Sequence, residues 1–422
     1  GFLDITEVEP LDNLHCPEGV IKEAQELLAK TYGVKKAYFV VNGSTAGNLA
    51  CIFDAFNEGD EVLVERNCHK SIYNGLILRK LKVKYIEPVI HEDKGLFLPP
   101  TEREIYKAIE SCNDLKGVIL TYPNYFGIGY DITETLIKLK KKGLKIIIDG
   151  AHGAHYGVTE KLPKSIVPYA DYIVLSAHKT LPSLTQGSYL LVNDDNNIEF
   201  YLRAFMTTSP SYLIMSSLDY SRYYLDCYGR EDYERLISIA EKWKEKINSF
   251  KKAVLLKEED LPSGYNFDLS RYVLTLSSEY SGHKLLDYLR SKKIQAEMSF
   301  ASGVVLILSP FNTEDDFEKI YEALEELDLE LIKDSGYQNY YSLPEKILEP
   351  YEVFNKEFIY IELEKCDGKV AKEAIIPYPP GIPLVCGGEV ISKKAIAIIE
   401  GYLKNNKTVI GVENKLVKII RE

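Results

Sequence analysis

The residues best suited to chemistry lie in two short motifs that each follow an apolar run. In SAHKT (176–180), Lys179 comes soon after such a run, close to a serine and a histidine. A lysine held in a crevice in this way is placed to form an imine with a carbonyl cofactor. In IIIDGAHGAHYG (146–157), Asp149 ends a strongly apolar segment, where a carboxylate is costly unless a cation pairs with it. A protonated ring nitrogen of a bound cofactor would be such a cation, so we expect Asp149 and Lys179 to contact two ends of one ring.

A third motif, NGSTAGNLA (42–50), offers a binding place for phosphate. Ser44 and Thr45 lie at a predicted strand-to-helix turn, where free backbone N–H groups and the helix dipole favour an anion. The motif is neither a P-loop nor a dinucleotide-binding loop, and the two hydroxyl side chains could instead be simple helix N-caps. An imine-forming lysine, a buried aspartate, a phosphate turn and an aromatic ring together describe a pyridoxal 5′-phosphate (PLP) site.

A metal site has to be considered because His152 and His155 closely follow Asp149. The sequence holds no HExxH motif and no other coherent set of metal ligands, so we expect no metal here. The seven cysteines are scattered and none forms a CxxC pair, which predicts neither a zinc site nor a disulfide framework. Reduced thiols in a cytoplasmic protein are the expected state.

Short apolar runs separated by amphipathic helical stretches must position these motifs. The runs are Ala37–Val41, Glu61–Val64, Val83–Ile86, Gly117–Thr121, Leu144–Ile148 and Tyr172–Leu175. Continuously apolar strands that alternate with helices predict an α/β fold whose mostly parallel sheet is covered on both faces. Candidate residues follow five of these strands, and ligands of open α/β sheets bind outside the carboxyl ends of the strands.

The later sequence predicts smaller domains. A long charged helix over Asp232–Phe250 leads out of the first domain, and strands at Tyr272–Leu276 and Val304–Leu308 indicate an α+β domain. A last portion holds a strand at Phe358–Leu363 and a Pro/Gly-rich loop at 377–388. We expect an N-terminal segment (1–30), a large cofactor-binding domain (31–235), a small α+β domain (236–340) and a C-terminal domain (341–422).

The composition excludes several classes of protein. Of the 422 residues, 45% are hydrophobic and 27% are charged, which is typical of a folded globular chain rather than a disordered one. The net charge of −12 argues against a nucleic-acid partner, and no apolar run is long enough for a membrane helix. The acidic balance is compatible with a small cationic substrate.

These motifs together resemble the Orn/Lys/Arg decarboxylase family of fold-type I PLP-dependent enzymes, and in particular its short Gram-positive-type members. The segments that carry the resemblance are LDNLHCPEGVIKEAQ (11–25), FVVNGSTAGNLA (39–50), RNCHKSIYNGLIL (66–78), DGAHGAHYG (149–157), SAHKTLPSLTQGSYL (176–190), TTSPSYLIMSSLD (207–219) and YPPGIPLVCGGE (378–389). The resemblance implies an aspartate aminotransferase-like large domain with smaller α+β domains. It also implies PLP-dependent decarboxylation of arginine, lysine or ornithine, in polyamine metabolism, by a homodimer.

The resemblance further implies roles for individual residues. Lys179 would hold PLP as an imine, Asp149 would keep the pyridine nitrogen protonated, and His178 would handle protons beside the imine. The residues implied to bind the cofactor are Ser44, Thr45, His69, Asp149, Ala151, His152, Ser176, Lys179, Thr207 and Thr208. Of these, His69 would stack on one ring face, and the two threonines would reach the partner subunit's phosphate. The active sites would therefore lie at the subunit interface.

The substrate-binding residues are the least determined part. Asn124 lies in a loop that could shape the pocket, and Glu297 and Glu389 are candidate acceptors for a cationic end. Each of these carboxylates could equally be structural. We expect arginine as substrate before lysine, and lysine before ornithine.

Two other functions stay open. An aminotransferase or lyase could use the same scaffold, although no arginine in the later half lies in a motif that suggests binding of a substrate carboxylate. A non-catalytic relative is the other alternative, and the presence of Lys179, Asp149 and His69 argues against it.

Some positions depart from the family's pattern. Gly150 replaces a frequent Glu, Ala177 a Thr, Asn124 a Thr and Gly387 a Pro. The sequence opens at Gly1 without the family's PGHK-type N-terminal segment, so we expect the natural protein to begin earlier.

Overall fold

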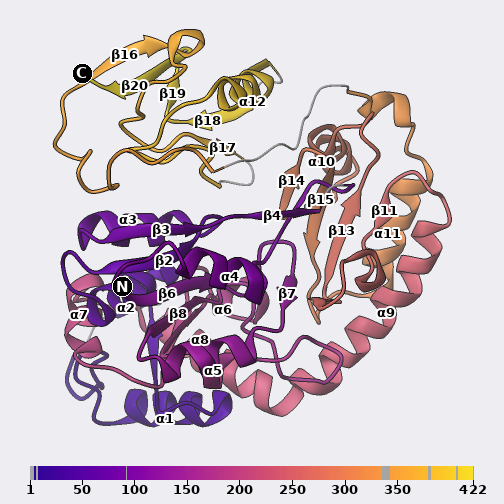
Figure 1. Cartoon of the computed structure of the whole chain (residues 1–422). Helices are drawn as coiled ribbons and strands as arrows, with labels where there is room; N and C mark the ends of the chain where they lie inside the picture. Colours follow the sequence, from indigo (N-terminus) through magenta and orange to yellow (C-terminus); the bar gives the residue numbers. More distant parts are fainter. Residues whose placement is uncertain are drawn as a thin grey trace.

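A computed structural model describes residues 4–5, 8–91, 93–334, 343–378, 382–404 and 407–421. Its large domain is built on a seven-stranded sheet in the order β1-β10-β9-β8-β6-β2-β3 (Figure 1). The strands are β1 (Lys36–Val40), β10 (Ser188–Val192), β9 (Tyr172–Leu175), β8 (Lys145–Asp149), β6 (Leu115–Thr121), β2 (Glu61–Glu65) and β3 (Lys82–Ile86). Strands β9, β8, β6, β2 and β3 run parallel, and β10 runs antiparallel to both its neighbours. The predicted mostly parallel α/β sheet is confirmed, but β10 is absent from the six predicted strands.

Both faces of this sheet are covered. Every residue of β2, β9 and β10 is buried, and successive residues of a strand point to opposite faces. The helices of this domain are α1 (Val20–Tyr32), α2 (Gly43–Ala55), α3 (Lys70–Leu78), α4 (Glu102–Ile109), α5 (Thr133–Lys141), α6 (Ala177–Thr180), α7 (Ile198–Phe205) and α8 (Tyr212–Tyr224). Helix α2 packs against β8, β9 and β10, which places its first turn beside the ends of the strands that carry the candidate site.

A smaller domain follows through the long helix α9 (Arg230–Asn248) (Figure 1). Its antiparallel sheet has the order β11-β13-β15-β14 and packs with α10 and α11 around a core of its own. The elements are β11 (Val254–Leu255), β13 (Arg271–Thr275), α10 (Gly282–Ser291), β14 (Met298–Phe300), β15 (Gly303–Ile307) and α11 (Glu314–Glu325). Strand β12 (Tyr265–Phe267) pairs instead with β7 (Ile128–Tyr130) of the large domain, and β4 (Val89–His91) forms a hairpin with β5 (Leu96–Leu98). The expected boundary between residues 235 and 236 therefore falls inside α9.

The C-terminal part has a third apolar core. It holds the sheet β16-β20-β19, the pair β17-β18 and one helix. The elements are β16 (Phe358–Glu362), β17 (Ile376–Tyr378), α12 (Lys393–Lys404), β18 (Thr408–Ile410), β19 (Val412–Glu413) and β20 (Leu416–Ile420). It lies against the β3 side of the large domain, where Lys346 Nζ donates to the carbonyl of Val83 at 2.5 Å (Figure 1).

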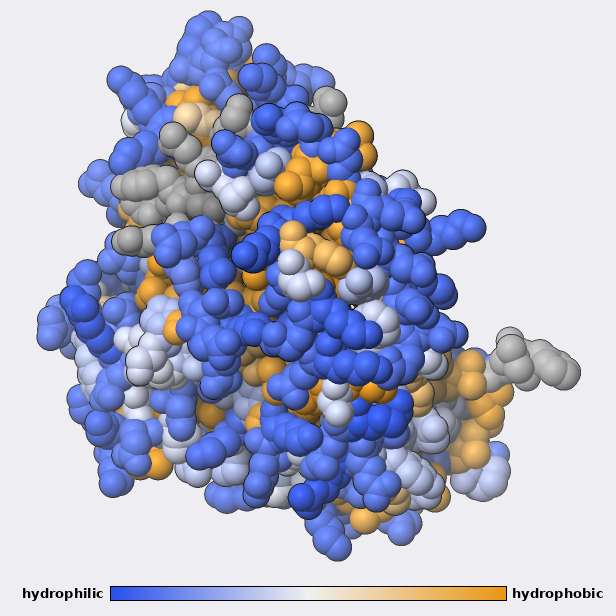
Figure 2. Space-filling model, turned by 90° about the vertical axis from the view of Figure 1, so that its right-hand side faces the viewer, coloured by the Kyte–Doolittle hydropathy of each residue, from blue (hydrophilic) through white to orange (hydrophobic). Residues whose placement is uncertain are grey.

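The surface is mostly hydrophilic on the face that Figure 2 shows, with hydrophobic residues in smaller groups between charged ones. Within the described part of the chain, no helix combines the length and the apolarity that crossing a membrane requires.

Candidate active site

The candidate residues gather at the carboxyl ends of the parallel strands. The register pairs Thr121 at the end of β6 with Asp149 at the end of β8, and Asp149 with Val174 of β9. These three strand ends are therefore level, and the segments that follow them meet at one edge of the sheet.

Asp149 is a buried carboxylate without an ion-pair partner in the part of the chain that the structure describes. Its side chain is 2% exposed. Its Oδ2 accepts a hydrogen bond from Asn48 Nδ2 at 3.0 Å, and its Oδ1 accepts from the Ala151 N–H at 3.2 Å. Among the described residues, no cationic group forms an ion pair with it. A buried charge in this state is costly, and the protonated pyridine nitrogen of PLP is a fitting partner.

Asn48 links Asp149 to His69 and was not among the predicted site residues. It is fully buried in α2, and its Nδ2 also donates to Ser71 Oγ at 2.9 Å. Ser71 Oγ lies 2.8 Å from Nδ1 of His69, the N-cap of α3. Burial lowers the pKa of His69, and the nearby Asp149 carboxylate opposes that shift. The only signal for Asn48 in the sequence is an amide within an otherwise apolar helical stretch.

Three serine hydroxyl groups meet beside the first turn of α2. Ser44 Oγ lies 2.5 Å from Ser176 Oγ and 3.1 Å from Ser188 Oγ. The helix begins at Gly43, and Ser44 is not its N-cap, because Asn42 holds that position without a side-chain bond. The hydroxyl groups and the free N–H groups of the first turn fit a phosphate, as the motif predicts. Thr45 lies on the same turn with an exposed side chain.

The Lys179 amine lies next to His152. Its Nζ is 3.1 Å from His152 Nε2 and 5.7 Å from the centre of the Tyr125 ring, which also packs on the His152 ring at 4.8 Å. Burial lowers the pKa of Lys179, which favours the uncharged amine that an imine requires. The expected proton-handling residue, His178, bonds instead through Nδ1 to the carbonyl of Gly187 at 2.8 Å. Spatially, then, His152 is the histidine in hydrogen-bond contact with the amine.

A buried group from the small domain completes this side of the site. Arg271 Nη2 donates to the carbonyl of His152 at 3.2 Å and lies 3.5 Å from its Nδ1. Arg271 Nε lies 3.5 Å from Asp268 Oδ2, which also accepts from His155 Nε2 at 3.0 Å. All these side chains are almost wholly buried. Arg271 is thus part of the site although its sequence setting gave no sign of this, because β12 and β13 bring it there from more than a hundred residues away.

The three substrate candidates lie in different surroundings. The Asn124 amide is used by its own loop: Nδ2 donates to the Phe97 carbonyl at 2.8 Å, and Oδ1 accepts from two backbone N–H groups at 3.0 Å each. Glu389 is 1% exposed and forms an ion pair with Arg66 at 2.7 Å, which favours the structural alternative that the sequence left open. Glu297 is exposed, and its charge opposes the burial that lowers the pKa of Lys179 and of His178, so it lies in the neighbourhood of both groups.

Two further residues that the resemblance implies to bind phosphate lie on the surface near the phosphate turn. Thr207 and Thr208 are exposed on the connection between α7 and α8, and the Thr207 N–H donates to Asn42 Oδ1 at 3.1 Å, next to the phosphate turn.

At Gly150, which departs from the family's pattern, an added Cβ would lie 2.8 Å from Leu175 Cδ2. The backbone here therefore has no room for a larger residue unless Leu175 shifts.

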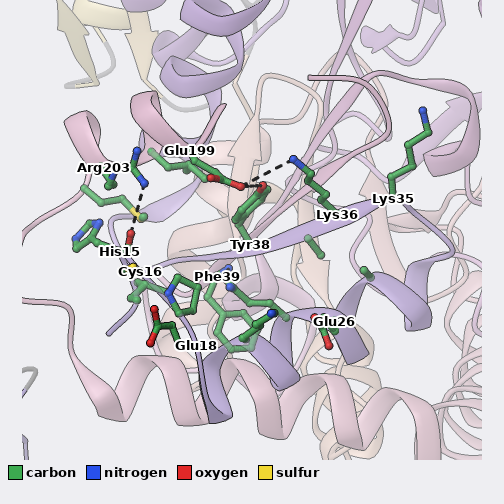
Figure 3. A pocket seen from close by; sticks show the side chains of 18 residues that line it. His15, Cys16, Glu18, Glu26, Lys35, Lys36, Tyr38, Phe39, Glu199 and Arg203 are labelled. Carbon is green, nitrogen blue, oxygen red and sulfur yellow. Dashed lines mark hydrogen bonds and ion pairs between the residues drawn. The ribbon is translucent and has the colours of Figure 1, made fainter. Parts of the chain in front are cut away.

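A cavity of about 510 Å³ lies elsewhere in the large domain, between α1, β1 and α7 (Figure 3). Tyr38 and Lys36 point toward Glu199 there, with Tyr38 Oη donating to Glu199 Oε1 at 3.0 Å. This cavity follows the outer edge of β1 and is lined by none of the candidate residues. Its size alone does not make it the active site, because the groups that could do chemistry lie at the strand ends.

Comparison with known proteins gives matches along most of the chain. Residues 2–262 match the major domain of Orn/Lys/Arg decarboxylase, and residues 334–411 match its C-terminal domain. The uncharacterized protein YaaO of Bacillus subtilis is 35% identical over 93% of this chain and 84% of its own length. The arginine decarboxylase of the same organism is 30% identical over 99% of this chain and 88% of its own length. Among solved structures, a lysine decarboxylase of Francisella novicida superposes with a TM-score of 0.82 at 18% identity, covering 98% of this chain and 73% of its own.

Proposed function

The chain belongs to the Orn/Lys/Arg decarboxylase family, and on this premise we propose that it removes the α-carboxylate of arginine to give CO2 and the corresponding amine. The protein is a PLP-dependent amino-acid decarboxylase. The observation that carries the proposal is the placement of Asp149 and Lys179 at neighbouring strand ends. One is a buried carboxylate with no ion-pair partner among the described residues, and the other is a lysine whose burial favours the uncharged amine.

The residues present fit PLP. When bound, PLP supplies an aldehyde and a protonated pyridine ring that accepts the electron pair left by the departing CO2. Asp149 would hold the proton on the ring nitrogen, and Asn48 would orient the carboxylate that does so. Ser44, Ser176 and the first turn of α2 would bind the phosphate. His69, held by Ser71, would cover one ring face.

Proton handling at the amine is assigned to His152 and His178. His152 Nε2 is in hydrogen-bond contact with Lys179 Nζ, so it can hold or give a proton at that atom. His178 is fixed by its bond to Gly187 and lies in the field of Glu297. His152 is 3% exposed and Lys179 is half-buried, so the protein limits the contact of water with the amine.

Arginine is the proposed substrate for two reasons. The relatives named arginine decarboxylase are about 30% identical over nearly the whole chain, whereas a lysine decarboxylase of Escherichia coli is 23% identical. Glu297 of the small domain is exposed and its charge acts on Lys179, so we propose its carboxylate as the partner for the guanidinium group. The product amine would be of the kind from which polyamines are made.

We further propose that the enzyme acts as a homodimer. Thr207 and Thr208 are exposed, and the Thr207 backbone is bonded to Asn42 beside the phosphate turn. A second copy placed against this surface would bring its own threonines to the neighbouring phosphate. Sedimentation of the full chain tests this, with a dimer as the expected species.

Transamination is the second candidate, and one observation favours it. Arg271 Nη1 is buried beside the site and has no hydrogen-bond partner within the described residues, so it could receive a substrate carboxylate that is to be retained.

The experiment is a panel of arginine, lysine and ornithine with PLP-loaded protein, measuring CO2 and amine, and, with an added 2-oxo acid, amino-group transfer. CO2 from arginine in preference to the others is expected, and Lys179→Ala is the control without activity. Glu297→Gln should reduce the preference for arginine, seen as a rise in KM. Bound PLP with no CO2 from any of the three would overturn the proposal, and amino-group transfer would favour the second candidate.

A further inference from the structure

A row of buried side chains leads from the small domain to the Lys179 amine. Asp268 contacts Arg271, Arg271 contacts the imidazole of His152, and His152 contacts Lys179, at 3.5, 3.5 and 3.1 Å respectively. Asp268 and Arg271 are 0% exposed and His152 is 3% exposed, so water does not screen these contacts.

The chemistry of these groups fixes where the protons lie. A guanidinium group only donates hydrogen bonds, so His152 Nδ1 must face Arg271 with a lone pair. A neutral imidazole with an unprotonated Nδ1 carries its proton on Nε2. The imidazolium form is disfavoured, because burial, followed by the charges of Lys179 and Arg271, holds the pKa of His152 well below its ordinary value.

We infer that Arg271 is a positioning residue that sets the tautomer of His152, so that His152 donates a hydrogen bond to Lys179 and holds it as an uncharged amine. An ammonium group has no lone pair and cannot accept the Nε2 proton. The amine can accept it, and the amine is the form that attacks a carbonyl. The inference deepens the proposed function, since it rests on Lys179 being the residue that binds PLP.

Several contacts with neighbouring residues position Arg271. Asp268, which holds Arg271, also accepts from Ser270 Oγ at 2.6 Å, and His155 stacks on Tyr233 at 5.0 Å. Gly127 leaves room for the arginine, because an added Cβ there would lie 2.6 Å from Arg271 Cγ. The contacts with Asp268 and Gly127 therefore limit the positions that the guanidinium can take beside His152.

Other charged groups face Lys179 and set its charge state jointly with this row. Burial lowers the pKa of Lys179, the carboxylates of Asp149 and Glu297 raise it, and Arg271 lowers it. His69 contributes as a neighbouring titratable group. Removing Arg271 eliminates one positive charge and frees His152 to turn its lone pair toward Lys179, and both changes favour the ammonium.

The test measures the charge state of Lys179 rather than turnover. In the full chain freed of PLP, the labelling rate of Lys179 by a small acylating reagent is followed against pH by mass spectrometry. Arg271→Met should raise the midpoint of this profile by about one pH unit. Arg271→Lys keeps the positive charge but not the planar fork, and should also raise it. Arg235→Met is the matched control, because Arg235 lies on α9 with its side chain 51% exposed, and should leave the midpoint unchanged.

A second measurement uses the wild-type protein, so it does not depend on the folding of a variant. With ¹⁵N-labelled histidine, the His152 signal is identified by its loss in His152→Gln. A proton on Nε2 is the expected state, and a proton on Nδ1 would overturn the inference. An unchanged midpoint in Arg271→Lys would also overturn it, since charge alone would then explain the effect. These results can be told apart from a failure of the proposed function. CO2 release together with an unshifted midpoint of the Lys179 labelling profile would contradict only the inference about Arg271. A shifted midpoint without CO2 release would contradict only the proposed decarboxylation.

Discussion

Arg66 and Arg271 are both fully buried, and they differ in how completely their guanidinium groups are bonded. Arg66 lies where the C-terminal domain meets the large domain. Its Nη2 donates to Glu389 Oε2 at 2.7 Å, its Nη1 contacts Tyr73 Oη and Cys386 Sγ, and its guanidinium lies 4.9 Å from the centre of the Tyr85 ring. Arg271 lies at the active site, where Nε and Nη1 have no hydrogen-bond partner within the described residues.

The difference separates a structural contact from a functional one. Both terminal nitrogens of Arg66 are bonded within the protein, and the main consequence of its ion pair with Glu389 is that the two domains dock in one arrangement. At the active site, by contrast, Asp149 has no ion-pair partner and Arg271 has spare donors among the described residues. Incomplete pairing of buried charges is costly, so its presence at the strand ends indicates groups kept for a cofactor and a substrate.

Breaking the buried ion pair of Arg66 with Glu389 should give the largest effect on stability. Arg66→Met leaves Glu389 buried without its cation, and we expect the free energy of unfolding to fall by about 3–5 kcal/mol. Denaturant unfolding measures this, and kcat of the folded fraction should stay close to wild type.

The double variant Arg66→Met/Glu389→Leu is the control for that experiment. Removing both charges should recover most of the lost stability, because no unpaired charge is then left in the interface. If the single variant were as stable as wild type, the interface would not depend on this pair.

Asp149→Asn tests the buried charge at the active site that is left without an ion-pair partner among the described residues. Without the carboxylate the ring nitrogen loses its anionic partner, and kcat should fall by about 10²–10³-fold, or roughly 3 kcal/mol. The PLP-free protein should not lose stability, since none of the described residues forms an ion pair with this carboxylate. Asp171→Asn is a matched control: Asp171 is equally buried but pairs with Lys140 at 3.0 Å, so stability should fall and kcat should not. The opposite pattern would show that Asp149 is structural.

Glu65, another buried carboxylate near the strand ends, allows a test of stability against pH. It is buried next to Thr121, and burial raises the pKa of its carboxyl from 4.5 to about 7, although the Thr121 N–H opposes the shift. Because the folded-state pKa lies above the unfolded value, this group's contribution is present below pH 4.5 and is lost as pH rises toward 7. Glu65→Gln should therefore be more stable than wild type by about 3 kcal/mol at pH 8 and similar to it at pH 4. Equal pH profiles of unfolding for the two proteins would contradict this.

The same contrast explains how far the sequence could predict this molecule. Lys179 and Asp149 were identifiable because each is a polar residue directly after an apolar strand, which is a local pattern. The strand β10 was not, since only the four-residue helix α6 separates it from β9, which breaks the alternation with longer helices used to find the other strands. Arg271 could not be found either, because its role comes from the packing of β12 and β13 against the large domain. Which histidine contacts the Lys179 amine also depends on the three-dimensional structure. His178 is next to Lys179 in sequence, yet His152 lies in hydrogen-bond contact with the amine.

The smallest expected effect concerns Asn48, the buried amide that orients Asp149. Its Nδ2 donates to both Asp149 Oδ2 and Ser71 Oγ, and Asn48→Ala removes both bonds while leaving the carboxylate in place. A lost bond to a buried charged group weakens the hold on the pyridine nitrogen by about 1 kcal/mol, so PLP should bind about five-fold more weakly. Asn193→Ala is the matched control, because Asn193 Nδ2 also donates two bonds, at 2.9 Å each, to backbone carbonyls in the same domain. It should lower stability without changing PLP affinity, whereas equal PLP affinity in both variants would mean that Asp149 is positioned by its backbone alone.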